Sequence, residues 1–289
     1  MSTVKEIFDV IAGTAGEIRE SLAGRRTYAD EENPSGEQQL EADVYADQLL
    51  AERLLAIDGV SAYASEERDD VLSDGNGDNT GYSLAVDPLD GSSNVRSNNA
   101  MGTIVGVYDA PLPAPGHTLV AAAYVLYGPL TTMMTAHNDT VTEYVVEDGE
   151  RHVVREGVTL PDDPTVYGFG GRVPDWTDDF RDYARSVEQE LKLRYGGAMI
   201  GDVNQVMTYG GVFAYPALES RPNGKLRLLF EGAPISYIVE TAGGRSSTGT
   251  ESILAVKPTE LHQRVPVHVG NTAYINKLDD TLNRSEQIS

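Results

Sequence analysis

Cysteine is absent from this chain of 289 residues. Disulfides, thiolate metal sites and cysteine nucleophiles are therefore excluded. The amino terminus has no basic region followed by an apolar core, so we expect no secretion signal. No apolar run approaches the ~20 residues that a membrane-spanning helix needs. Together these features predict a cytoplasmic protein without a membrane partner.

Lysine is scarce, because only five of the 22 basic residues are lysines, and 45 acidic residues bring the formal net charge to −23. Such a charge repels phosphate backbones, which argues against a nucleic-acid partner. The acidic residues are spread along the chain instead of forming a tail. Dispersed acidity with few lysines is typical of proteins from a salt-rich cytoplasm, where ions screen the self-repulsion. We therefore expect the unfolding midpoint to rise with KCl concentration.

Histidine is also sparse, and the five histidines show no spacing typical of a metal site. The glycine-rich stretch 168–171 lacks the Gly-x-Gly-x-x-Gly pattern, and no phosphate-loop lysine follows it. Neither a histidine metal centre nor a dinucleotide-binding loop is therefore expected.

Two carboxylates flank a small turn in the first half of the chain. Asp87 and Asp90 are three residues apart, and Gly91-Ser92-Ser93 follows at the start of a predicted helix. Residues 82–86 have the pattern of a strand, so both carboxylates would lie at its carboxyl end, where open α/β sheets place ligands. Oxygen ligands suit Mg²⁺ or Mn²⁺, and backbone N–H groups at a helix start suit a phosphate. The same residue types also form ordinary surface turns, and that alternative stays open at this point.

A second acidic pair, Glu66-Glu67, follows the apolar segment 60–64 and can also end a strand. A lone pair of this kind is usually a solvated surface feature. Two acidic pairs at predicted strand ends, one of them beside a turn suited to phosphate, favour a metal site instead. Asp43 lies on a predicted helix from about 38 to 55, so it can face the same site.

A longer set of segments resembles the fructose-1,6-bisphosphatase family of Mg²⁺-dependent sugar phosphatases. The resemblance runs from about residue 36 to 270. The segments that carry it, in order, are 65–67, 87–94, 194–199, 209–216, 222–231, 240–244 and 261–266.

This resemblance implies a layered α/β fold with alternating α-β-α-β-α layers. We expect an N-terminal α/β domain, residues 1–160, that carries most metal ligands, and a C-terminal α/β domain, residues 161–289, that carries the sugar site and Glu231. The two prolines of the cluster 161–164 mark the predicted boundary. The family also implies a homo-oligomer, either a dimer or a tetramer.

The resemblance further implies two or more Mg²⁺ or Mn²⁺ ions per subunit. It suggests that Glu67, supported by Asp43, removes a proton from a metal-activated water, and that Asp90 is the third catalytic residue. The implied metal ligands are Glu66, Glu67, Asp87, the carbonyl of Leu89, Asp90 and Glu231. The implied substrate-binding residues are Asp90, Gly91, Ser92, Ser93, Arg194, Tyr195, Met199, Tyr215 and Lys225, with Arg194 reaching in from a neighbouring subunit.

The implied reaction is hydrolysis of the 1-phosphate of fructose 1,6-bisphosphate, in gluconeogenesis. Sedoheptulose-1,7-bisphosphatase and inositol monophosphatase are alternatives, and a non-catalytic metal-binding regulatory protein with this fold is an alternative from another class. Phe230-Glu231 follows the fructose-bisphosphatase pattern, whereas inositol monophosphatases carry Trp-Asp there.

Two departures from the family pattern affect what the resemblance predicts. Where the family carries an Asn near the distal phosphate, this chain has the segment 167–172, so either Arg172 compensates or the substrate range is wider. The nucleotide-contacting Lys-Tyr of the animal enzyme is Gly81-Tyr82 here, and the segment before Gly36 is shorter. We therefore expect weak or absent inhibition by AMP.

Overall fold

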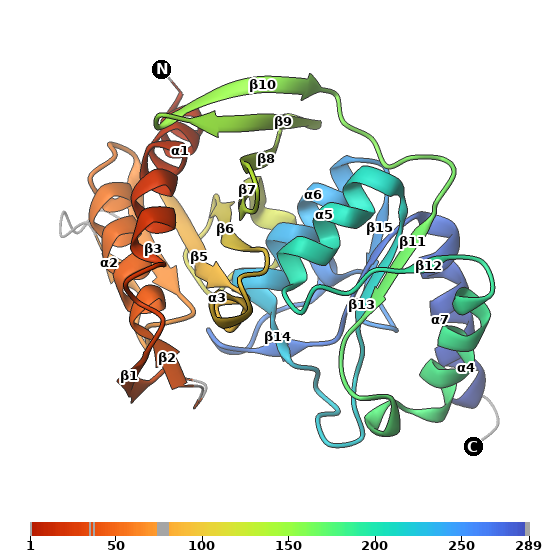
Figure 1. Ribbon diagram of the computed structural model, residues 1–289. Helices are drawn as coiled ribbons and strands as arrows, with labels where there is room; N and C mark the ends of the chain where they lie inside the picture. The colour runs from red at the N-terminus through yellow and green to blue at the C-terminus, as the bar shows by residue number, and fades with distance from the viewer. Residues whose placement is uncertain (1, 35, 37, 74–80, 287–289) are drawn as a thin grey trace.

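Helices and sheets alternate in layers across the molecule, and Figure 1 shows these layers from left to right. The computed structural model describes residues 2–34, 36, 38–73 and 81–286. In the described chain two helices cover an eight-stranded sheet, two more lie between this sheet and a five-stranded sheet, and two cover the far side. The predicted α/β fold with alternating α-β-α-β-α layers is therefore confirmed.

The eight-stranded sheet is antiparallel except where β3 and β5 run side by side in parallel. This parallel pair matters because it brings two carboxyl strand ends to the same edge of the sheet. From one edge to the other, the strands are β10 (Glu150–Glu156), β9 (Thr140–Glu147), β8 (Thr131–His137), β7 (Leu119–Tyr127), β6 (Met101–Tyr108), β5 (Tyr82–Asp90), β3 (Val60–Ser65) and β4 (Leu72–Ser73).

Helices α1 (Thr3–Ser21) and α2 (Glu41–Leu55) pack on one face of this sheet. Apolar residues at helical spacing are buried along α1, and the side chain of Ser2 caps its start. Alternation along β5 divides the side chains between the two faces: Leu84 and Val86 pack beneath these helices, whereas Ala85 packs on the opposite face.

Helices α5 (Met199–Tyr209) and α6 (Ala233–Thr241) form the middle layer and share one core with both sheets. The outermost helices, α4 (Asp178–Glu188) and α7 (Thr272–Glu286), cover the other face of the second sheet. The second sheet runs β12 (Lys192–Leu193), β11 (Val166–Phe169), β13 (Gly211–Tyr215), β17 (Val267–Gly270) and β15 (Arg245–Ser247). The remaining elements are β1 (Tyr28–Glu32), β2 (Gln38–Leu40), α3 (Asn94–Ser97), β14 (Leu226–Arg227), β16 (Arg264–Val265) and single helical turns at Gly116–Thr118, Val173–Asp175, Leu228–Gly232 and Ile253–Ala255.

Local predictions near the amino terminus were partly wrong. The helix predicted from about residue 38 begins at Glu41, because Leu40 is extended, and the segment before it contains β1, which pairs with β2. This segment is polar and shows no apolar alternation, so its pairing left no periodic signal in the sequence.

None of the helices in the described chain combines the length and the apolar character of a bilayer-spanning segment.

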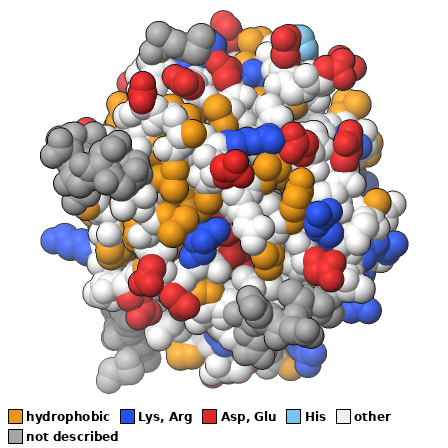
Figure 2. All heavy atoms as spheres, turned by 90° about the vertical axis from the view of Figure 1, so that its left-hand side faces the viewer, with side chains coloured by type: hydrophobic (Ala, Val, Ile, Leu, Met, Phe, Trp, Pro, Cys, Tyr) orange, Lys and Arg blue, Asp and Glu red, His pale blue; other side chains and the backbone are white. Residues whose placement is uncertain are grey.

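Figure 2 shows Asp and Glu side chains spread over the face on the α1 and α2 side, with Lys and Arg side chains among them. The division into domains at residue 160 stays a prediction.

His268 lies on β17, buried between the second sheet and helix α4, and its burial makes the stability of this region depend on pH. Its Nδ1 donates a hydrogen bond to the Ser247 carbonyl at 2.9 Å, and its ring stacks on Phe180. Burial lowers the pKa of His268 to about 4. The unfolded chain therefore binds more protons than the native protein between about pH 6.5 and 4, and the free energy of unfolding falls as the pH is lowered through this window.

We expect His268→Gln to remove the pH dependence that His268 adds to the free energy of unfolding, while keeping an N–H donor. The stability difference between the natural protein and the variant should shrink from pH 7 to pH 4, by on the order of 3 kcal/mol. Urea unfolding at fixed KCl measures it, and a difference that is constant with pH would contradict the assignment.

Candidate active site

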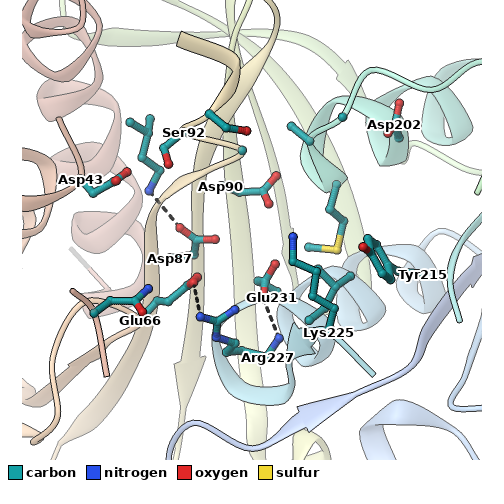
Figure 3. Close-up of a pocket in the computed structure, with 18 of the residues that line it drawn as sticks. Asp43, Glu66, Asp87, Asp90, Ser92, Asp202, Tyr215, Lys225, Arg227 and Glu231 are labelled. Atoms are coloured by element: carbon teal, nitrogen blue, oxygen red, sulfur yellow. Dashed lines mark hydrogen bonds and ion pairs between the residues drawn. The ribbon is translucent and has the colours of Figure 1, made fainter. Parts of the chain in front are cut away.

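A cavity of about 270 Å³ lies where the carboxyl ends of β3 and β5 meet the middle helical layer and the segment after β13. Figure 3 shows acidic side chains from both halves of the chain converging in it. The cavity is lined by Asn33, Gln39, Leu40, Asp43, Glu66, Glu67, Asp87, Leu89, Asp90, Gly91, Ser92, Ser93, Tyr195, Gly197, Ala198, Met199, Asp202, Phe213, Tyr215, Lys225, Leu226, Arg227 and Glu231.

The parallel pairing of β3 and β5 explains why the two acidic pairs meet. Ser65 lies opposite Val86 in the register, and the Glu66 N–H donates to the Val86 carbonyl at 3.1 Å. Glu66 and Asp87 therefore leave adjacent strands at the same edge. The pairing of β5 with β6 shifts register between Asp87 and Asp90, so the strand continues irregularly past its predicted end.

Backbone N–H groups orient three of these carboxylates. The Leu89 N–H donates to Asp87 Oδ1 at 2.9 Å, and the Ile200 N–H donates to Asp90 Oδ2 at 2.7 Å. Glu231 Oε2 accepts a hydrogen bond of 2.6 Å from the Arg227 N–H, which directly precedes the π-helical turn Leu228–Gly232. Hydrogen bonds to a charged acceptor are strong, so these side chains are held before any ligand binds.

Glu66, Asp87 and Glu231 can each offer one carboxylate oxygen such that the three oxygens lie within 4.8 Å of one another, and all three residues are buried. A buried set of hard oxygen donors without nitrogen or sulfur ligands fits Mg²⁺ or Mn²⁺. Arg227 places Nη2 at 3.0 Å from Glu66 Oε1, so one cation already lies in the cluster.

The pKa values of the cluster show the crowding of negative charge. Burial and the charges of Glu66, Asp90 and Glu231 raise the pKa of Asp87 well above its ordinary value. Burial likewise raises the pKa of Glu231, and it raises that of Asp90 to about 7. Carboxylates buried at this density need a cation, which a bound metal supplies.

Glu67 and Asp43 lie beside the cluster. Burial, with the charges of Asp43 and Glu66, raises the pKa of Glu67 to about 9, although Gln39 Nε2 donates a hydrogen bond to it. Burial raises the pKa of Asp43 to about 7, and the Leu40 N–H donates to its Oδ2 at 2.7 Å. Without a metal both groups therefore bind a proton near neutral pH, and a cation bound in the cluster would favour the ionised forms, one of which a catalytic base needs.

The turn at 91–93 also lines the cavity, and Ser92 lies beside Asp43 (Figure 3). Gly91 has φ +74°, and a Cβ there would come within 2.1 Å of the Ala198 Cβ, so only glycine fits. The helix predicted to follow is α3, which is a single turn of four residues. A single turn carries only a small dipole, so the backbone N–H groups of the turn itself are what the structure offers to an anion.

The other end of the cavity carries the predicted sugar-binding residues. Tyr195, Met199, Tyr215 and Lys225 line it, and Lys225 Nζ lies 5.7 Å from the centre of the Tyr215 ring. In Figure 3 Lys225 and Tyr215 lie on the side away from Asp43. Arg194 is exposed and does not line this cavity, so its contribution to a neighbouring subunit stays a prediction.

Comparison with known proteins agrees with this geometry. Residues 5–155 match the family model of the fructose-1-6-bisphosphatase N-terminal domain, and residues 160–283 match that of the C-terminal domain. The chain belongs to the fructose-1,6-bisphosphatase family.

Several members of this family are similar over nearly their whole length. The class 1 fructose-1,6-bisphosphatase of Natronomonas pharaonis is 62% identical, over 96% of this chain and 98% of that protein. That of Halobacterium salinarum is 58% identical, over 96% and 97%. The crystal structure of holo Leishmania major fructose-1,6-bisphosphatase superposes with a TM-score of 0.92 at 28% identity, over 98% of this chain and 95% of that one.

Sequence reasoning missed three residues of the fructose-1,6-bisphosphatase site. Arg227 has the sequence surroundings of an apolar strand. Its position four residues before Glu231 was a signal that could have indicated a cation beside the acidic residues. Asp202 is buried and accepts a hydrogen bond from the Gly196 N–H at 2.6 Å, so it fixes the loop that leads to Tyr195. Gln39 was assigned to a helix start and instead reaches Glu67 from β2.

Proposed function

We propose that this protein is a metal-dependent phosphatase that hydrolyses the 1-phosphate of fructose 1,6-bisphosphate to fructose 6-phosphate and phosphate. The observation that carries the proposal is one cavity with a buried acidic cluster at one end and Lys225 with two tyrosines at the other. Such a cavity suits a sugar with a phosphate at each end. Similarity to proteins named fructose-1,6-bisphosphatase class 1 supports the choice of sugar.

The residues that would hold the metal are Glu66, Glu67, Asp87, the carbonyl of Leu89, Asp90 and Glu231, and the proposed complement is two or more Mg²⁺ or Mn²⁺ ions per subunit. A bound divalent cation polarises phosphoryl oxygens and lowers the pKa of water. The family membership and the buried cluster support a metal; its identity and number belong to the proposal.

Within this site Glu67 accepts the proton of the attacking water, and Asp43 stabilises Glu67 in its protonated form. Burial and the charges of Asp43 and Glu66 raise the pKa of Glu67 when no metal is present, and bound cations would restore the ionised form that accepts the proton. The backbone at Asp90, Gly91, Ser92 and Ser93 holds the scissile phosphate.

At the opposite end Tyr195, Met199, Tyr215 and Lys225 hold the sugar and its distal phosphate, with Arg194 supplied by a neighbouring subunit of a dimer or tetramer. A cytoplasmic location and weak inhibition by AMP complete the proposal.

The experiment that tests the proposal compares three substrates in concentrated KCl with saturating Mg²⁺. We expect kcat/KM to be highest for fructose 1,6-bisphosphate, because its distal phosphate reaches Lys225, and at least about tenfold lower for inositol 1-phosphate, which lacks that phosphate. Sedoheptulose 1,7-bisphosphate should lie between them. Preferred hydrolysis of inositol 1-phosphate would contradict the proposal, and release from none of the three would favour a non-catalytic metal-binding protein.

A further inference from the structure

The candidate active site is continuous with a second, outer cavity. Tyr195, Tyr215 and Lys225 line both cavities, so the outer one begins where the sugar end of the inner one stops. Arg172 and Arg221 line only the outer cavity. Neither arginine is among the implied substrate-binding residues, although Arg172 was offered above as compensation for a family Asn near the distal phosphate.

The two cavities differ in the sign of their charge. Seven carboxylates line the inner cavity with one lysine and one arginine, whereas two arginines and Lys225 line the outer cavity with one carboxylate, Asp175. The chain as a whole has a formal net charge of −23, so a cavity with an excess of cations stands out from its surroundings. A cavity of this kind attracts anions to the outer end of the site.

Arg172 follows a tightly packed turn at the end of β11. Trp176 Nε1 donates a hydrogen bond to the Gly170 carbonyl at 2.8 Å, and a Cβ at Gly170 would come within 2.3 Å of the Tyr215 ring. Gly171 has φ +85°, which only glycine adopts readily. The backbone before Arg172 is therefore packed directly against a tyrosine that lines both cavities.

Arg221 is anchored to the same region. Leu218 and Arg221 exchange backbone hydrogen bonds of 3.1 and 2.9 Å. Asp175 accepts hydrogen bonds from Ser220 N at 2.9 Å and Ser220 Oγ at 2.5 Å. These bonds, followed by the charges of Arg172 and Arg221, lower the pKa of Asp175. Asp175 therefore joins the turn that carries Arg172 to the turn that carries Arg221. The charges of both guanidinium groups act on its carboxylate.

We propose that Arg172 and Arg221 are specificity-determining residues of this chain, which bind the distal phosphate of a bisphosphorylated ketose. The proposal rests on the proposed function and deepens it, because it assigns bisphosphates over monophosphates as the substrate class and names the residues that discriminate. A guanidinium binds a phosphate through parallel N–H donors. That geometry retains directed hydrogen bonds in concentrated salt, where a simple attraction between charges is screened.

The test uses Arg172→Ala, Arg221→Ala and the double variant, with Arg185→Ala as the matched control. Arg185 is an exposed arginine on α4 that pairs with Asp182 and lines neither cavity. Calorimetry measures the Kd of fructose 6-phosphate, which keeps only the distal phosphate. Kinetics measure kcat/KM for fructose 1,6-bisphosphate and for fructose 1-phosphate, which lacks the distal phosphate.

We expect the double variant to raise the Kd of fructose 6-phosphate and to lower kcat/KM for the bisphosphate, each by about 10-fold or more. The loss for fructose 1-phosphate should be several-fold smaller, and Arg185→Ala should leave the Kd unchanged. Equal losses for both substrates, or an unchanged Kd in the double variant, would overturn the proposal. If the natural protein hydrolysed neither substrate, the proposed function would fail, and the Kd comparison would still decide whether the arginines bind the phosphate.

Discussion

Replacing Asp90 by Asn is expected to lower Mg²⁺-dependent kcat/KM by about 10³-fold or more, because the change removes charge where the metal and the scissile phosphate meet. The fold should survive, since Asn is isosteric and its oxygen can still accept the hydrogen bond from the Ile200 N–H, now 2.7 Å from Asp90 Oδ2. Stability without metal should be unchanged or higher, because burial and the charge of Glu66 disfavour the ionised Asp90 carboxyl. Phosphate release and thermal unfolding, each with Mg²⁺ and with a chelator, measure both effects.

The matched control for this change is Asp202→Asn. Asp202 is buried in the same cavity, and burial raises its pKa to about 7, but its Oδ1 accepts a hydrogen bond from the Gly196 N–H on the sugar side. We expect this variant to keep the stabilisation by Mg²⁺, which Asp90→Asn should largely lose. Equal stabilisation of both variants by Mg²⁺ would show that Asp90 does not bind the metal.

The acidic half of the site could be predicted from the sequence because its signal is local. Glu66 and Asp87 directly follow apolar segments, so each reads as the end of a strand, and parallel pairing of the two strands is enough to bring them together. The resemblance to a family added Glu231, whose own surroundings in the sequence resemble an ordinary strand end.

Other parts could not be predicted because long-range contacts determine them. The burial of Arg227 depends on Glu66, which directly follows β3 of a different sheet. The pairing of β1 with β2 joins two polar segments by backbone hydrogen bonds, which leave no mark on side-chain patterning. The outer cavity depends on Asp175 meeting Ser220, two residues that look like unremarkable polar loop positions.

The second large effect is expected for Arg227→Met, measured without metal. Arg227 is 2% exposed, and its Nη2 lies 3.0 Å from Glu66 Oε1, so the two side chains form a buried ion pair. Methionine fills a similar volume and leaves the buried carboxylates without this positive charge. Breaking a buried ion pair from one side costs about 3–5 kcal/mol, and we expect a loss of stability of that order in a chelator.

Added Mg²⁺ should recover part of this loss, because a ligand that binds only the native state stabilises it, and a cation among Glu66, Asp87 and Glu231 offsets the missing guanidinium. Denaturant unfolding at fixed KCl, with and without Mg²⁺, measures the recovery, and Arg185→Met, which removes an exposed pair, should change neither value measurably. If Mg²⁺ stabilised the natural protein and Arg227→Met by the same amount, Arg227 and the metal would act independently. A larger stabilisation of Arg227→Met would show that both positive charges act on one acidic cluster, with the arginine holding it together until the metal binds.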